Sequence, residues 1–283
     1  MEHVPATPKR IFPKTTGLTA LWRHRQPLRV LIQRDLAVKY QKSALGYLWS
    51  LIEPLGMACI YWFIFGLVFN RAGLPGDAMG YPLYVVSGIF AWMWVSSALS
   101  EATTSLVSQS SLITTMRVPR EVFPVARVFA RFTEFLAGFP ILMLFVWLFG
   151  GQVGWHSFIL VGALVLQVVL LTGISFILAS INVLYRDVER FMRLIMRVMF
   201  YAAPVIYPLS KVMDALEKYD WAQYLYMANP FVTVMQLHRA AWDPGHFMPS
   251  AKMLYVSIGT GVFLLFFGRW LFHKLEPRVL KEL

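Results

Sequence analysis

The sequence has few charged residues and a single cysteine. Asp, Glu, Lys and Arg make up 14% of the 283 residues, whereas about a quarter of a soluble domain is charged. Apolar residues make up 58%, so the chain can bury its apolar surface only against lipid or other membrane-spanning helices. The lone Cys59 excludes a disulfide within the chain, and its position in an apolar run indicates a packing residue.

Motifs of several catalytic classes are absent as well. No G-x-x-x-x-G-K-[ST] string occurs, so the chain contains no P-loop and we expect it to hydrolyse no ATP by itself. Neither H-E-x-x-H nor a paired-cysteine pattern is present, which predicts no metal site and no catalytic residues. Ionisable residues are missing from the middles of the apolar segments 82–106, 158–184 and 253–272, which argues against an ion-driven carrier.

Long apolar segments dominate the rest of the chain. A membrane crossing needs about 20 residues, and six segments qualify or nearly qualify: 46–69, 82–106, 122–149, 158–184, the short 194–209 and 253–272. We therefore predict an all-α integral membrane protein with six transmembrane helices. Residues 221–242 are too broken for a lipid-exposed span, and we predict a re-entrant helical region there, before the last span.

The flanking segments differ from this membrane domain at 46–272. Residues 1–19 contain three prolines and are predicted to form a flexible N-terminal tail, and residues 273–283 a cytoplasmic C-terminal tail. In 20–45, apolar residues at 28, 31, 32 and 36 follow helical spacing, although Asp35 and Lys39 interrupt that face. We predict an amphipathic cytoplasmic interface helix, with an ordinary solvated basic segment as the alternative.

The distribution of basic residues predicts the orientation. The net charge is +11, and 21 of the 26 Lys and Arg residues lie in the segments that are inside if both termini are cytoplasmic. Because cytoplasmic loops carry the excess of Lys and Arg, both termini are predicted to be cytoplasmic, which requires an even number of spans. The same distribution explains the basic charge without nucleic-acid binding.

Five strings then follow one another along the chain. They are RDLAVKYQKSALGYLWSLIEP at 34–54, LITTMRVPREVFP at 112–124, NVLYRDVERF at 182–191, NPF at 229–231 and HKLEPRVLKEL at 273–283. With these strings in this order, the sequence from about residue 20 to the end resembles the type-2 ABC exporter permeases of bacterial polysaccharide export. That group handles O-antigens, capsules, teichoic acids and cell-wall galactan.

The resemblance implies a transporter permease rather than an enzyme. It would pair with a second copy of itself and with two copies of a separate nucleotide-binding ATPase subunit, which would bind ATP and Mg. The implied substrate is an undecaprenyl- or similar lipid-linked polysaccharide, and the implied location is the bacterial cytoplasmic (inner) membrane, in contact with membrane lipid. One alternative is a type-2 ABC permease for a drug or lipid. The other is a membrane enzyme of envelope glycan synthesis, which would need clustered acidic residues where the loops offer only scattered ones.

Three groups of candidate site residues follow. By the resemblance, the 112–124 loop is the coupling helix that docks into the ATPase subunit, unless its basic residues only retain the loop inside. The residues expected to carry this ATPase coupling are Leu112, Ile113, Arg117, Pro119, Arg120 and Glu121.

The second group is expected to brace the cytoplasmic entrance. Arg127, Arg131 and Glu134 share one helical face and could pair with the interface helix or with each other. Arg186 and Asp187 match the R-D motif of the family. Glu53 would be costly in lipid, so it is expected to face protein or water at the entrance, with a buried pair to a nearby arginine as the alternative.

The third group consists of aromatic residues that could line the glycan conduit. Tyr61, Phe65 and Phe69 share a face of the first apolar segment, and Tyr201 and Tyr207 lie on the proline-broken fifth segment. Aromatic rings suit a sliding sugar polymer because they contact sugar C–H faces without requiring one hydroxyl pattern. Ordinary core packing is the alternative for each of these residues.

Overall fold

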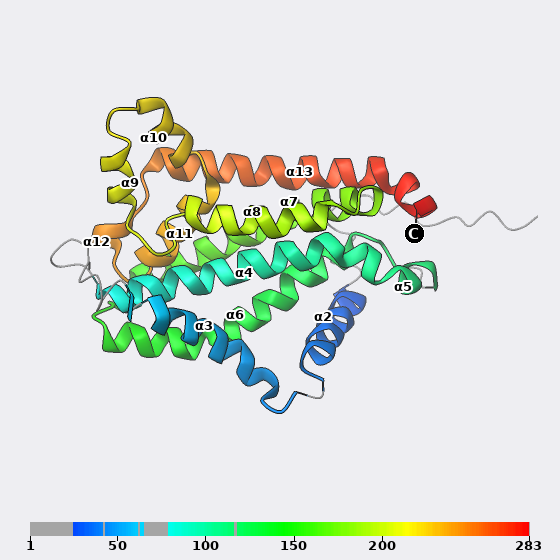
Figure 1. Cartoon of the computed structure of the whole chain (residues 1–283), viewed down its shortest axis with the longest axis horizontal. Helices are drawn as coiled ribbons and strands as arrows, with labels where there is room; N and C mark the ends of the chain where they lie inside the picture. Colours follow the sequence, from blue (N-terminus) through cyan, green and yellow to red (C-terminus); the bar gives the residue numbers. More distant parts are fainter. Residues whose placement is uncertain (1–24, 42, 62, 65–78, 116–117, 283) are drawn as a thin grey trace, which may run out of the picture.

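The protein is a bundle of helices that lie side by side (Figure 1). The computed structural model describes residues 25–282 except 42, 62, 65–78 and 116–117. The described helices are α2 (Arg25–Tyr40), α3 (Trp49–Tyr61), α4 (Tyr81–Ser108), α5 (Ser110–Thr115), α6 (Val122–Leu148), α7 (Ile159–Leu184), α8 (Val188–Ala202), α9 (Leu209–Ala215), α10 (Asp220–Met227), α11 (Pro230–Ala240), α12 (Pro244–Phe247) and α13 (Ala251–Glu282). Two short 3₁₀ turns, Gly46–Leu48 and Trp155–Phe158, precede α3 and α7.

Four of the described helical segments are long and apolar enough to cross a membrane. They are Tyr81–Ser108, Val122–Leu148, Trp155–Leu184 and Ala251–Glu282. Since the described residues contain no strand, the prediction of an all-α integral membrane protein is confirmed for them. The count of six spans stays a prediction.

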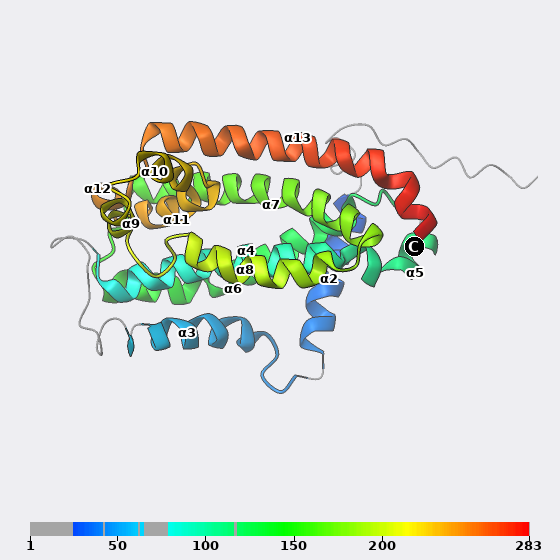
Figure 2. The same cartoon turned by 45° about the horizontal axis from the view of Figure 1, so that its top comes forward.

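Helix α4 lies at the centre of the bundle. It packs against α6, α7, α8, α11 and α3, and most of its side chains are buried. Helices α9, α10 and α12 gather at one end of the bundle, while α5 and the C-terminus lie at the other (Figures 1 and 2). Helix α2 lies across the bundle near the C-terminal end (Figure 2).

Several boundaries differ from those expected. The fifth apolar segment was expected at 194–209, but α8 begins at Val188 and ends at Ala202. Residues 203–208 form an irregular stretch because Pro204 and Pro208 cannot donate helical hydrogen bonds. Residues 273–282, expected as a tail, continue α13. The expected interface helix is represented by α2, and residues 1–24 lie outside the described part of the chain.

Small residues allow α7 and α13 to approach closely. A Cβ atom on Gly268 would lie 2.2 Å from the carbonyl oxygen of Gly173, and one on Gly173 would lie 2.6 Å from the backbone of α13. Helices in membranes often meet through such residues, since they let the backbones come together.

We expect Gly268→Ala to destabilise the inserted chain by about 1–3 kcal/mol, because the methyl group must push α7 away from α13. The measurement is thermal unfolding of the purified chain. The matched control is Gly259→Ala on the same helix, where an added Cβ meets nothing within 4 Å. Equal unfolding temperatures for the two variants would contradict this account of the contact.

Candidate functional site

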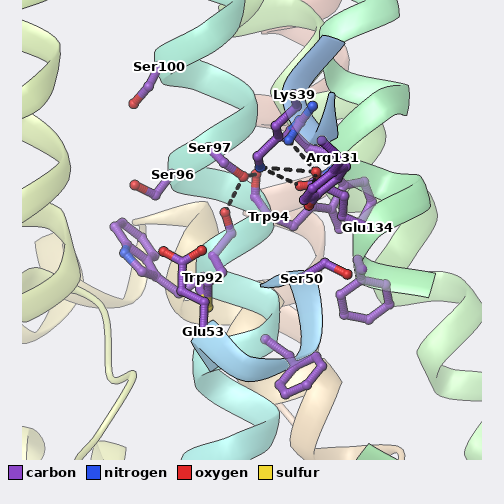
Figure 3. Close-up of a pocket in the computed structure, with 14 residues that line it drawn as sticks. Lys39, Ser50, Glu53, Trp92, Trp94, Ser96, Ser97, Ser100, Arg131 and Glu134 are labelled. Carbon is purple, nitrogen blue, oxygen red and sulfur yellow. Dashed lines mark hydrogen bonds and ion pairs between the residues drawn. The ribbon is translucent and has the colours of Figure 1, made fainter. Parts of the chain in front are cut away.

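A cavity of ≈ 280 Å³ opens between α2, α3, α4 and α6 (Figure 3). Its walls combine aromatic rings, hydroxyl groups and charged groups. The lining residues are Lys39, Tyr40, Ser50, Glu53, Phe90, Trp92, Met93, Trp94, Ser96, Ser97, Ser100, Arg131, Glu134 and Phe135. A polar cavity on apolar helices can hold a molecule with both sugar-like hydroxyls and hydrocarbon.

One side of the cavity is an ion-pair network on α6. Arg131 lies 3.2 Å from a carboxylate oxygen of Glu101 and 2.5 Å from one of Glu134. The ammonium of Lys39 lies 3.0 Å from Glu134, and the Tyr40 hydroxyl donates to the same carboxylate at 2.7 Å. Glu134 thus joins α2 to α6 at the edge of the cavity (Figure 3).

The network continues beneath α2. Arg127 lies 3.2 Å from Asp35 and 3.8 Å from Glu101, and the Gln109 amide donates to Asp35 at 3.3 Å. Burial raises the pKa of Asp35, while Arg127 and Arg131 oppose that shift by favouring the carboxylate. The two residues that interrupt the apolar face of α2, Asp35 and Lys39, are therefore the ones that pair with α6.

The tryptophans of the cavity are held by the core. Trp94 donates its indole N–H to the carbonyl of Val128 at 3.2 Å, and its ring centroid lies 4.9 Å from that of Phe132. Trp92 meets Phe200 of α8 edge-on, with ring centroids 6.1 Å apart. These rings are fixed in place and can serve as a rigid wall.

The structure brings together part of the predicted entrance group. Glu53 is exposed on α3 and lines the cavity together with Arg131 and Glu134. Arg127 lies next to them through its pair with Glu101. Arg186 and Asp187 do not line the cavity; both are exposed at the turn between α7 and α8.

The predicted coupling loop is tied to the end of α13. Arg120 is buried and lies 2.5 Å from Glu276. Glu121 is also buried and pairs with Arg269 at 2.8 Å and with His273 at 2.5 Å. These two side chains face α13, and their contact with an ATPase subunit stays a prediction.

The other residues predicted to carry ATPase coupling differ in their burial. Ile113 on α5 is buried, while Leu112 and Pro119 are partly buried. Arg117 lies outside the described residues.

The predicted conduit aromatics separate into two sets. Tyr201 is exposed at the end of α8, and Tyr207 donates its hydroxyl to the Tyr201 carbonyl and lies 3.3 Å from the Tyr226 hydroxyl. The backbone of Tyr61 ends α3, whereas its side chain and the residues Phe65 and Phe69 lie outside the described structure. Conduit lining stays a prediction for all five.

The sequence analysis did not single out Arg193 and Arg197 of α8, and it took Arg190 to follow the fourth span. Residues 185–197 were counted as an inner segment, but Arg190, Arg193 and Arg197 lie within the helix and are exposed. The spacing of these arginines, three and four residues, could have indicated a helix, since Met192 and Met196 follow the same helical period on another side. Among the described residues, no three His, Cys, Asp or Glu side chains lie close enough together to hold a metal ion.

Four apolar helical segments of membrane-crossing length in the described part of the chain define an integral membrane protein, and a polar cavity opens among its helices. Residues 26–242 match the ABC-2 type transporter family. This match covers more than half of the chain, so the protein belongs to that family and is a transporter permease.

Related proteins align over nearly the whole chain. It is 31% identical to an O-antigen export system permease protein of Klebsiella pneumoniae, over 89% of this chain and 92% of the relative. It is 28% identical to an O-antigen export system permease protein of Myxococcus xanthus, over 90% and 94%. A polysialic acid transport protein of Escherichia coli is 24% identical over 89% and 95%.

Proposed function

We propose that this chain is the membrane permease of an ATP-driven exporter that moves a lipid-linked polysaccharide out of the bacterial cytoplasm across the inner membrane. The observation that carries the proposal is the alignment, over about nine-tenths of both chains, with permeases named for O-antigen and polysialic acid export. A glycan exporter is favoured over a drug or lipid permease for this reason. Neither the P-loop of an ATPase nor the acidic cluster of a glycan-synthesising enzyme occurs in the sequence.

The cavity supports a lipid-linked glycan as the substrate. The hydroxyls of Ser96, Ser97 and Ser100 and the rings of Trp92 and Phe90 suit the polar edges and C–H faces of sugars. The neighbouring helix α3 has exposed apolar side chains such as Ile52 and Ile60. A hydrocarbon tail can stay on that apolar surface while the polar head occupies the cavity.

The proposal includes six spans per subunit and two subunits. Helices α3 and α8 would be the first and fifth spans. Most of the described α3 side chains are exposed, as is an apolar side of α8 with Phe191 and Val198, and a second copy or lipid would cover both. Helix α11 has 11 residues, about 16 Å of helix, so it is too short to cross and would be re-entrant.

The driving force would come from two copies of an ATPase subunit that bind ATP and Mg and attach on the cytoplasmic side. The excess of Lys and Arg in the predicted inner segments supports a cytoplasmic position for both termini. In this orientation α2 lies toward the cytoplasmic side, where a newly made lipid-linked glycan would arrive, and the cavity extends from α2 to the middle of α4.

The test of the proposal uses a strain that lacks this chain, complemented by the full-length protein. We expect polysaccharide to accumulate inside the mutant cells on its lipid carrier and to return to the surface on complementation. The measurement is surface glycan staining together with carrier-lipid extraction. Normal surface glycan in the mutant, with altered drug or lipid efflux, would refute the glycan assignment.

Coupling is expected to pass through the ion pair of Arg120 and Glu276. We predict that Arg120→Ala and Glu276→Ala each reduce export while the ATPase subunit still co-purifies, because each loosens the loop from α13. The double variant should lose no more than either single variant if the pair acts as a unit. A larger loss of ATPase co-purification in Arg120→Ala than in Glu276→Ala would instead mean that Arg120 contacts the ATPase directly.

A further inference from the structure

Helix α8 has three chemically different sides. Met192 and Met196 are buried, where the helix packs on α4. A second side is apolar and exposed, and a third carries exposed arginines at positions 190, 193 and 197. Only the third side is unusual for a helix in a membrane domain, where exposed charges are costly.

The arginine side of α8 lies on the same side of the helix as a residue that contacts the cavity wall. Arg193 precedes Phe200 by seven residues and Arg197 precedes it by three, so all three side chains share one side of the helix. Phe200 contacts Trp92, which lines the cavity. Helix α8 therefore passes beside the cavity at Trp92, and the arginines extend from that contact toward the start of the helix.

Helix α4 lines the cavity with hydroxyl groups. Ser96 and Ser100 lie on α4, and their side chains point away from the Arg131–Glu134 pair toward the other side of the cavity (Figure 3). They are partly exposed and stand four residues apart on one helical face. Hydroxyl donors and guanidinium groups on neighbouring helices are a combination that can bind anionic oxygen atoms.

The arginines are short of internal partners. Arg193 pairs with Glu189 at 2.5 Å, and both side chains remain about half exposed, at 55% and 48%. In the described part of the chain no carboxylate lies within ion-pair distance of Arg190 or Arg197. In the proposed six-span arrangement, in which α8 is the fifth span, Arg197 lies about 13 Å along the helix from its start, which is close to half of a ~30 Å hydrocarbon core. An arginine at that depth needs water or an anion beside it.

We propose that Arg190, Arg193 and Arg197 form a phosphate-binding track in the transport path. The track would hold the diphosphate that joins the polyprenyl carrier to the glycan. This inference rests on the proposed function, because it assumes a lipid-linked substrate. The planar guanidinium group binds phosphate oxygens through two parallel hydrogen bonds. The three arginines are spaced along α8 so that the diphosphate can move from one arginine to the next. The hydroxyls of Ser96 and Ser100 add neutral donors from the facing helix.

The test measures lipid retention by the purified full-length chain, using native mass spectrometry from nanodiscs of neutral lipid. Three ligands are compared: a polyprenyl diphosphate without sugar, the polyprenol of equal length, and phosphatidylglycerol. We expect the diphosphate to be retained at least about tenfold better than the polyprenol, the usual strength of one hydrogen bond to a charged group. Equal retention of diphosphate and polyprenol would overturn the proposal. Equal retention of phosphatidylglycerol would mean a general anionic-lipid site and would overturn it too.

Variants assign the effect to α8. Arg193→Gln with Arg197→Gln should lower diphosphate retention by about tenfold or more, whereas the exposed Arg278→Gln near the end of α13 should leave it unchanged. The matched lysine variants keep the charge and lose the two-pronged geometry, so they should bind with intermediate strength. If the glutamine variants do not insert into the membrane, the lysine variants still test the proposal. Wild-type retention of the polyprenyl diphosphate by the lysine variants would refute the phosphate-binding track. The assay needs neither glycan nor ATPase, so its failure is distinct from a failure of surface export.

Discussion

Replacing Arg131 by Met should lower the stability of the inserted chain by about 3–5 kcal/mol, the usual result of removing one partner from a buried ion pair. The Arg131 side chain is 1% exposed and joins carboxylates from two helices, Glu101 of α4 and Glu134 of α6. Methionine fills a similar volume but leaves the two acids facing each other. Among the described residues, Lys39 forms its ion pair with Glu134, so the ion-pair partner left to Glu101 would be Arg127, at 3.8 Å.

Thermal unfolding of the purified chain measures the effect. Arg278→Met is the matched control, since Arg278 is exposed and surface substitutions usually change stability by less than about 0.5 kcal/mol. Adding Glu134→Gln to Arg131→Met should recover part of the loss, because it removes one of the uncompensated charges. A loss below about 1 kcal/mol in Arg131→Met would show that water reaches the network and that it does not hold α4 to α6.

Part of this network could be predicted from the sequence. Spacings of four and three residues place Arg127, Arg131 and Glu134 on one helical face, and the structure has them together. Their partners on α2, Asp35 and Lys39, were visible in the sequence only as polar residues that interrupt an amphipathic pattern. Nothing in a single sequence says which helices are neighbours, and Lys39 and Glu134 are 95 positions apart. The pairing of Asp35 with Arg127 could therefore not be derived from periodicity.

The boundaries of α8 were harder to predict for a different reason. Hydropathy averages over a window, so four basic residues in 185–197 moved the expected start of the fifth segment past Arg193. The helix instead begins at Val188 because buried methionines at 192 and 196 pack on α4. Tertiary packing thus decided the position of the arginines, on which the proposed phosphate-binding track depends.

The second large effect is expected at Arg239 of α11, which is 0% exposed. Its guanidinium donates to the carbonyl of Val205 at 2.6 Å and lies over the ring of Tyr84, 3.6 Å from its centroid. The two next carbonyls accept from tyrosines of α4: Ile206 from the Tyr81 hydroxyl at 3.1 Å and Tyr207 from the Tyr84 hydroxyl at 2.6 Å. Side chains from α4 and α11 therefore satisfy three successive carbonyls of the irregular 203–208 stretch.

This arrangement explains how a proline-broken segment is tolerated next to a buried helix. Backbone groups that no helix satisfies must find other partners when water is excluded. Room for the guanidinium comes from Gly88, where an added Cβ would lie 2.6 Å from an Arg239 nitrogen and 2.5 Å from the Val205 oxygen. The buried guanidinium of Arg239, with its carbonyl and aromatic partners, thus holds the stretch that follows α8. It thereby fixes where α8 ends and which way its arginine side faces.

Arg239→Met should therefore cost about 2–5 kcal/mol, combining an unsatisfied carbonyl at roughly 1–3 kcal/mol with a lost cation–π contact of about 1–2 kcal/mol. Tyr84→Phe removes a single hydroxyl and should cost about 1 kcal/mol. Hydrogen exchange locates the effect: amides of 203–208 should exchange faster in Arg239→Met, while those of α6 keep wild-type rates. Uniform acceleration over the whole chain would mean general destabilisation, and unchanged exchange at 203–208 would show that the prolines alone hold the break. Because the break sets where α8 ends, the same variant should also weaken polyprenyl diphosphate retention, although it changes none of the three arginines on α8.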